Sequence, residues 1–254
     1  MTTVVKASRQ DARLVLTIDR PERRNALNPE VILALQEALH GVKADETIRA
    51  VVLTGAGEEA FCAGADLGAD AFAFDYATPT IAYADLLRTA RMVNVPLVAR
   101  VNGACMAAGM GLLAMCDLAI AAPHAIFGLP EAKVGVFPMQ VLAVLQAQVP
   151  PRFLTQLCLT GDPIDAARAR EIGLVNEVAN DLDGALERLL LRLQSNSPTA
   201  LRRGLYAMKA MRSMSFEEAI AFGEGQIGLL AMTQDARAGI AAFKDKRKPL
   251  WTSK

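Results

Sequence analysis

The chain has 254 residues, and 52% of them are hydrophobic, which is ample material for a core and excludes both a disordered chain and an extended coil. The 27 basic and 27 acidic residues cancel, so no overall charge recruits nucleic acid or an anionic membrane. The four cysteines lie singly and only two histidines are present, which excludes a disulfide framework and a zinc or histidine-rich metal centre and fits a reducing compartment.

The hydrophobic segments of the chain predict a cytoplasmic protein without a membrane partner. Charged residues, among them Lys6 and Arg9, interrupt the first apolar run, so it has no secretory hydrophobic core. Residues 101–116 and 134–151 are apolar enough to suggest membrane spans, but the first is rich in Gly and Ala and the second contains Pro138. We therefore expect both segments to be buried core.

The first half of the sequence alternates strand and helix patterns. A short β-type run at 14–18 is followed by a helix that starts at Pro29, is capped by Asn28 and ends near Gly41. Further buried strands are predicted at 50–54, 96–101 and 118–121, with a helix over roughly 79–94. This order predicts an α/β chain of β-α-β units.

From Val141 onward the pattern is helical, and strand signals nearly vanish. Helices are predicted at 152–159, from an Asp165 cap toward 171, and at 182–193, 199–212, 216–232 and 235–243. The run Ser195-Asn196-Ser197-Pro198 breaks this pattern. We therefore predict a core over residues 1–195 and a C-terminal helical region over 196–254.

One glycine-containing segment imitates a dinucleotide-binding loop. Gly55-Ala56-Gly57-Glu58-Glu59-Ala60 follows a strand and satisfies G-x-G-x-x-A. Two glutamates would face the pyrophosphate, however, and no helix pattern begins at the loop. The dinucleotide interpretation is rejected.

Two other loops consist of residues small enough for a ligand to approach the backbone. They cover 60–67 and 102–109, and each follows a predicted strand. Two peptide N–H groups aimed at one point form an oxyanion hole, and the helical run 108–116 would add the positive end of its dipole. Two turns packed tightly in a core explain the same spacing.

The order of several motifs makes the sequence recognisable. The motifs are Arg24-Asn25-Ala26-Leu27-Asn28, Ala60-Phe61-Cys62-Ala63-Gly64-Ala65-Asp66-Leu67, the loop from Asn102-Gly103 to Met115-Cys116-Asp117, and Phe127-Gly128-Leu129-Pro130-Glu131. Further matching segments lie at 159–162, 169–176 and 243–247. In this order they resemble the crotonase family, which includes the enoyl-CoA hydratases and isomerases, over nearly the whole chain.

The resemblance implies a spiral core of β-β-α units and a C-terminal helical region that builds a homotrimer or a dimer of trimers. It also implies an acyl-CoA thioester substrate, with coenzyme A as part of the substrate and no permanently bound cofactor. By motif position, the peptide N–H groups of Ala63 and Ala108 would hold the thioester oxygen. The CoA channel would be lined by Arg24, Ala26, Ala65, Asp66 and Leu67. The nucleotide of a neighbouring subunit's CoA would be reached by Phe243 and Lys246.

One departure from the family pattern bears on the reaction. Family hydratases have a glutamate at the position of Gly111, which acts with a second glutamate that remains here as Glu131. Hydration by two carboxylates would then lack one of the two, whereas a 1,3-proton shift needs only one base, which takes a proton and returns it. The sequence therefore favours moving a 3-enoyl-CoA double bond to the 2-position. Met139 stands where dienoyl isomerases, dehalogenases and some thioester hydrolases of the family have an aspartate.

Three alternatives remain open at this stage. Glu131 alone could support hydration, the chain could be a catalytically inactive CoA- or RNA-binding homologue, or Glu131 could be an ordinary acid at a helix start. Apolar neighbours would raise the pKa of Glu131 toward the range of a general base. A glutamate placed at Gly111 is expected to have only a small backbone cost, because Glu is about 0.8–1 kcal/mol better than Gly in a helix interior.

Several other polar residues receive no catalytic role from the sequence. Asp117 is interpreted as a capping or turn residue, and His124 as part of a surface turn. No histidine accompanies Cys62 or Cys105, so a cysteine nucleophile is not expected. Residues 66–83 are expected to form a mobile lid over the acyl pocket.

Overall fold

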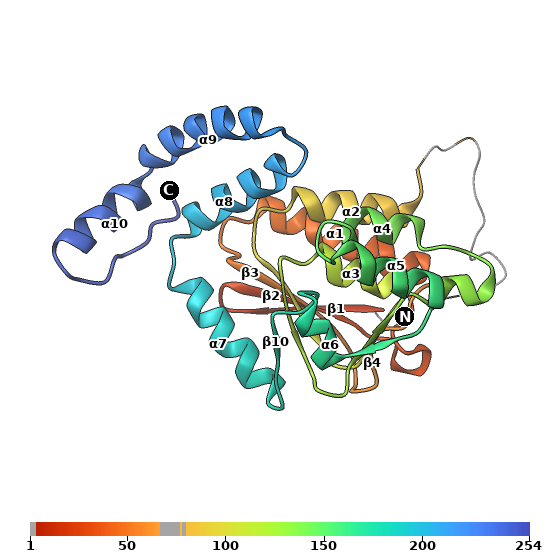
Figure 1. Cartoon of the computed structure of the whole chain (residues 1–254). Coiled ribbons are helices and arrows are strands. Elements are labelled where there is room, and N and C mark those ends of the chain that lie inside the picture. The colour runs from red at the N-terminus through yellow and green to blue at the C-terminus, as the bar shows by residue number, and fades with distance from the viewer. Residues whose placement is uncertain (1–3, 67–76, 78–79) are drawn as a thin grey trace.

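Two β-sheets flanked by helices make up the structure, a computed structural model that describes residues 4–66, 77 and 80–254 (Figure 1). The larger sheet has the strand order β1-β2-β3-β5-β7-β10, and the smaller has the order β4-β6-β8-β9. The strands are β1 Val5–Gln10, β2 Arg13–Ile18, β3 Ala50–Gly55, β4 Ala60–Cys62, β5 Leu97–Val101, β6 Ala104–Met106, β7 Leu118–Ala121, β8 Ile126–Gly128, β9 Ile164–Asp165 and β10 Glu177–Val178. The helices are η1 Pro21–Arg23, α1 Pro29–Ala44, α2 Ala82–Met92, α3 Ala108–Met115, η2 Pro130–Val134, α4 Met139–Leu145, α5 Pro151–Thr160, α6 Ala166–Glu171, α7 Leu182–Gln194, α8 Pro198–Met211, α9 Phe216–Ala231 and α10 Gln234–Lys244.

The structure repeats a β-β-α unit along the first half of the chain. Pairs β1-β2, β3-β4, β5-β6 and β7-β8 are each followed by a helix, α1 to α4. The first strands β3, β5 and β7 pair in parallel in the large sheet, and the second strands β4, β6 and β8 pair in parallel in the small one. The β-α-β units predicted from periodicity are therefore incomplete: β3, β5 and β7 are parallel as such units require, but the prediction missed β4, β6 and β8, which have only three residues each.

The predicted helix at Pro29 is confirmed, with a corrected end. The side chain of Asn28 accepts a hydrogen bond of 2.9 Å from the N–H of Val31, as an N-cap should. The helix continues past Gly41 to Ala44 because Val42 is fully buried against the sheet. The burial of Val42 outweighs the low helix propensity of one glycine.

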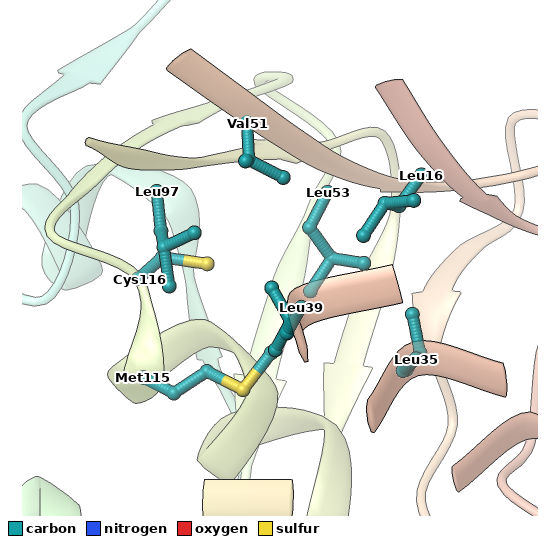
Figure 2. Close-up of a pocket in the computed structure, with 8 residues that line it drawn as sticks. All are labelled: Leu16, Leu35, Leu39, Val51, Leu53, Leu97, Met115 and Cys116. Carbon is teal, nitrogen blue, oxygen red and sulfur yellow. The ribbon is translucent and has the colours of Figure 1, made fainter. Parts of the chain in front are cut away.

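The core lies between the large sheet and the helices on one of its faces. Every residue of β3 is buried, as expected for a central strand of a parallel sheet. Figure 2 shows the apolar side chains from α1, α3 and the sheet that surround a void of about 10 Å³. A void of this size would barely hold one water molecule, and its lining offers no polar partner. It is a packing defect of the core and has no part in the site described below.

The two apolar segments that could suggest membrane spans are parts of this core. Residues 101–116 form the end of β5, β6 and α3, in which Gly109 to Ala114 are buried. Residues 134–151 contain α4, whose Val141 and Leu145 are buried. Among the described residues, no helix is long and apolar enough to cross a membrane.

The C-terminal helices leave the body of the molecule one after another. Helix α7 packs its Leu182, Ala185, Leu186 and Leu190 on the other face of the large sheet. Helix α8 lies against that body, to which Arg202 and Lys209 donate hydrogen bonds, whereas α9 and α10 extend away from it (Figure 1). Helix α9 buries none of its residues. The predicted break near residue 195 coincides with the turn between α7 and α8. A division into two domains there stays a prediction.

Candidate active site

Parallel pairing in the small sheet brings the two small-residue loops together. Strand β4 pairs with β6 through Ala60 opposite Ala104 and Cys62 opposite Cys105. Just beyond β4, Gly64 has φ of +111° and packs against the second loop. A Cβ atom on Gly64 would lie 2.9 Å from the Cβ of Ala107 and 3.7 Å from the nitrogen of Ala108. The peptide groups on either side of Gly64 therefore lie beside the start of α3.

The structure corrects one of the two predicted oxyanion donors. The N–H of Ala63 donates a 3.0 Å hydrogen bond to the carbonyl of Arg24, so it is not free to hold a thioester oxygen. The next candidate is the N–H of Ala65, an exposed residue whose amide has no hydrogen-bond acceptor within the described part of the chain. Successive peptide groups alternate in direction here. The N–H of Leu27 donates to the carbonyl of Gly64, and the N–H of Asp66 donates to the carbonyl of Leu27. The amide of Ala65 consequently points to the opposite side from that of Asp66.

Ala108 occupies the position expected of the second donor. It is the first residue of α3, where a helical N–H has no partner within the helix and carries the positive end of the dipole. The preceding Ala107 has φ of +50° and ψ of −122°, a conformation that costs a non-glycine residue roughly 1–3 kcal/mol. Its N–H donates to the carbonyl of Gly128 at 2.9 Å, which holds this strained turn in place.

Glu131 is a half-buried carboxylate on the short helix η2. Its Oε2 atom is buried and has no hydrogen-bond partner among the described residues. Burial raises the pKa of Glu131 above its usual 4.5. A hydrogen bond from the backbone N–H of Glu131 to its own carboxyl group acts in the opposite direction, so an acid at the helix start remains one of its roles. A carboxylate that has an unpartnered oxygen and a raised pKa is suited to accept a proton.

The position of the absent family glutamate is filled by a tyrosine. A Cβ atom on Gly111 would overlap the hydroxyl oxygen of Tyr83 and would lie 3.2 Å from its Cζ and 3.4 Å from Cγ2 of Val141. Tyr83 is 7% exposed and lies in the first turn of α2. The small backbone cost expected for a glutamate at Gly111 covers helix propensity alone, and the occupied side-chain space adds a steric cost that the sequence did not show.

The residues predicted to line a CoA channel are brought together in part. An isolated bridge joins Leu27 to Ala65, which places the segment of Arg24 and Ala26 beside that of Ala65 and Asp66. Arg20 fastens the two segments, because its guanidinium donates to the carbonyl of Ala26 at 2.6 Å and pairs with Asp66 at 2.9 Å. Sequence patterns alone assigned no role in the site to Arg20. Leu67 and most of the expected lid at 66–83 lie outside the described residues.

Two buried asparagines from the recognised motifs hold the loops in position. Asn25 is fully buried and donates to the carbonyls of Ala56 and Ala60 at 3.0 and 2.7 Å. Asn102, 3% exposed, donates to Gly57 and Ala60 at 2.7 and 3.2 Å. The turn after β3 is thus tied to the loops on both sides and leads into β4, and no helix follows it as a dinucleotide loop would require.

Phe243 and Lys246 lie far from Glu131 in the same chain. Helix α10 sits at the opposite end of the molecule from α4 and α5 (Figure 1). Phe243 is 86% exposed, and Lys246 follows the end of α10 with φ of +52°. Within one chain these two residues therefore lie apart from the loops that carry Ala65 and Ala108.

The other polar candidates have structural roles. Asp117 accepts a 2.9 Å bond from the N–H of Leu97 and pairs with Lys209 at 3.3 Å, beside a hollow of about 350 Å³ under α8 that contains neither Glu131 nor Ala108. Burial raises the pKa of the Cys62 thiol to about 12, so it stays protonated near neutral pH and is a poor nucleophile. His124 is exposed, as expected of a surface turn.

Several known proteins resemble this chain over nearly its whole length. The profile of the enoyl-CoA hydratase/isomerase family matches residues 8–254. The 2,3-dehydroadipyl-CoA hydratase of Escherichia coli is 34% identical over 246 residues, covering 95% of this chain and 96% of that protein. The crotonyl-CoA hydratase of Syntrophomonas wolfei is 31% identical over 97% of this chain and 96% of its own.

Solved structures agree with the architecture. An enoyl-CoA hydratase from Geobacillus kaustophilus superposes with a TM-score of 0.92 at 30% identity, covering 99% of this chain and 98% of that one. One from Mycobacterium smegmatis gives a TM-score of 0.90 at 30% identity, with 98% of each chain covered. These likenesses confirm the predicted crotonase-like fold with C-terminal helices. The chain belongs to the enoyl-CoA hydratase/isomerase family.

Proposed function

We propose that this protein moves the double bond of a 3-enoyl-CoA thioester to the 2-position, with Glu131 as its single acid and base. Two observations together carry the proposal: Glu131 has a buried carboxylate oxygen, Oε2, without a hydrogen-bond partner, and position 111 is a glycine whose side-chain space is filled by Tyr83. Among the described residues, position 111 therefore contributes no second carboxylate beside Glu131, and a 1,3-proton shift needs only one.

The proposed reaction conserves every atom of the substrate. Glu131 takes a proton from C2 of the thioester, and the electron pair of that C–H bond moves into a dienolate. The negative charge that develops on the thioester oxygen is held by the N–H groups of Ala65 and Ala108. The protonated Glu131 then returns the proton to C4, which leaves the double bond between C2 and C3.

Hydration through Glu131 alone is the second candidate. It is favoured by the names of the relatives above, which are hydratases acting on 2,3-dehydroadipyl-CoA and crotonyl-CoA. In this case Glu131 would have to deprotonate water and also deliver a proton to C2. An inactive homologue that binds CoA or RNA has less support, because the zero net charge provides no electrostatic attraction for RNA.

A panel of 2- and 3-enoyl-CoA thioesters distinguishes these candidates. We expect 3-enoyl-CoA to be consumed as the absorbance of the conjugated thioester rises, and 2-enoyl-CoA to lose that absorbance at a much lower rate. Comparable or faster loss of the conjugated absorbance from 2-enoyl-CoA would establish hydration as the main activity. Absence of turnover with every thioester would leave the inactive homologue.

The CoA part of the substrate is proposed to lie along the paired segments that carry Arg24, Ala26, Ala65 and Asp66. Leu67 belongs to the same proposal by motif position. Phe243 and Lys246 would contribute to the CoA site of a neighbouring subunit, which is consistent with their distance from Glu131 within one chain. This part of the proposal requires an oligomer.

We predict a homotrimer or a dimer of trimers. Helices α8 to α10 and the segment after them expose large apolar side chains, among them Tyr206, Met208, Phe216, Ile220, Ile227, Leu229, Met232, Ile240, Phe243 and Leu250. Exposed apolar surface on this scale is typical of a subunit interface. Sedimentation equilibrium at micromolar concentration should give three or six times the mass of the chain. A monomer would contradict the assembly and remove Phe243 and Lys246 from the site.

A further inference from the structure

Tyr83 connects the empty side-chain position at Gly111 with the proposed oxyanion residue Ala108. Its hydroxyl occupies the place that a side chain at Gly111 would take. The same hydroxyl donates a hydrogen bond of 2.6 Å to the carbonyl of Ala108. One phenol therefore both fills position 111 and contacts Ala108, whose N–H is the proposed donor to the thioester oxygen.

Ala108 is held from two sides by these contacts. The N–H of Ala107 is bonded to Gly128 on β8, and the carbonyl of Ala108 is bonded to Tyr83 on α2. The strained conformation at Ala107 persists only where the surroundings fix it. A hydrogen bond from a buried phenol to the next residue supplies such a constraint, because no solvent competes for the donor.

Tyr83 also lies close enough to Glu131, Cys62 and Cys105 for negative charge on any of these groups to raise the pKa of its phenol. Burial, together with these groups, keeps its pKa well above 10, so the phenol remains a neutral donor through the range in which Glu131 titrates. Its only proton is committed to Ala108, so Tyr83 is not available as a second acid for adding water.

We propose that Tyr83 is a positioning residue, which fixes the oxyanion peptide at Ala108 and closes position 111 to a second acid and its water. The inference rests on the proposed function, since it assumes that Ala108 holds a thioester oxygen. It adds a reason why the site favours proton transfer over hydration. The oxyanion hole works through the amide of Ala108, and Tyr83 works through Ala108.

The first readout is the carbonyl stretch of a bound thioester that cannot isomerise. Butyryl-CoA labelled with ¹³C at its thioester carbon is saturated at C3 and C4, so its infrared difference spectrum reports hydrogen bonding alone. We expect wild type to shift the stretch to lower frequency and Tyr83→Phe to shift it less. Tyr206→Phe makes the same chemical change on α8, where Tyr206 is 46% exposed, and should match wild type.

The second readout is the kinetics of 3-enoyl-CoA isomerisation. Tyr83→Phe should lower kcat by about 10-fold and change KM by less than about twofold, because the oxyanion contact strengthens in the transition state. The thermal midpoint of each variant checks that the protein is folded. An unchanged carbonyl shift in folded Tyr83→Phe would overturn the role of Tyr83 and leave the proposed function intact. Absence of any shift in wild type would overturn both.

Discussion

Replacing Glu131 with Gln is expected to lower kcat for 3-enoyl-CoA isomerisation by about 10²-fold or more, with little change in CoA affinity. Glutamine keeps the shape of the side chain and removes the group that accepts the C2 proton. The measurement is the rise of conjugated thioester absorbance under saturating substrate, together with CoA binding by calorimetry. The effect is large because, among the described residues, Glu131 is the only carboxylate whose charge acts on Tyr83, so no other carboxylate is placed to substitute for it.

The pH dependence supplies an independent check on Glu131. Only the carboxylate accepts a proton, so the rate should fall as pH drops through the pKa of Glu131, which burial places above 4.5. The same shift means that the folded state holds this proton more tightly than the unfolded state does. Its contribution to stability is therefore greatest at low pH and is lost as pH rises through the folded pKa.

An exposed glutamate provides the matched control for this variant. Glu37 lies on the solvent side of α1, and Glu37→Gln makes the same chemical change without touching the site. It should retain wild-type kcat and the acid limb of the pH profile. Wild-type turnover in Glu131→Gln would eliminate the single-base mechanism and require a different proton acceptor.

Gly111→Glu is expected to lower the free energy of unfolding by about 2–4 kcal/mol, through overpacking and loss of the Tyr83 hydrogen bond. The new Cβ overlaps the hydroxyl of Tyr83, which must leave Ala108 to make room. Helix propensity acts in the opposite direction by only about 0.8–1 kcal/mol. Urea denaturation of the purified variant measures the difference.

Two further variants isolate the cause of that loss. In a Tyr83→Phe background the hydroxyl is gone and the nearest ring atom is Cζ at 3.2 Å, so Gly111→Glu should be much less harmful. Gly41 is also a helical glycine, but a Cβ there meets nothing within 4 Å, so Gly41→Glu should be neutral or stabilising. A Gly111→Glu protein as stable as wild type would show that Tyr83 moves aside without a loss of stability, which contradicts the prediction.

The double variant also tests the chemistry at position 111. With Tyr83→Phe making room, Gly111→Glu places a second carboxyl group in the site, and the pair could hold water between them. We expect measurable hydration of a short 2-enoyl-CoA by this double variant and very little by wild type. Desolvation and the neighbouring charge should raise the pKa of one of the pair. Wild-type hydration as fast as that of the double variant would make hydration through Glu131 alone the better proposal.

The sequence by itself determined the features that depend on neighbouring residues. The caps at Asn28 and Asp165 and the helices from Pro151 to Lys244 follow from side chains within a few positions of each other, and the structure has them nearly where they were predicted. The order of the motifs identified the family. The uncharged segment at 101–116 was interpreted correctly as core because its glycines and alanines mark close packing.

Only the tertiary structure decided which groups are free to act. The amide of Ala63 is bonded to Arg24, and Tyr83 fills the space beside Gly111; each pair is distant in sequence and joined by the fold. The short strands β4 and β6 have no periodicity of their own and exist because they pair with each other. Local patterns encode helices and caps, whereas the availability of a donor or of a volume depends on the chain segments that fold against it.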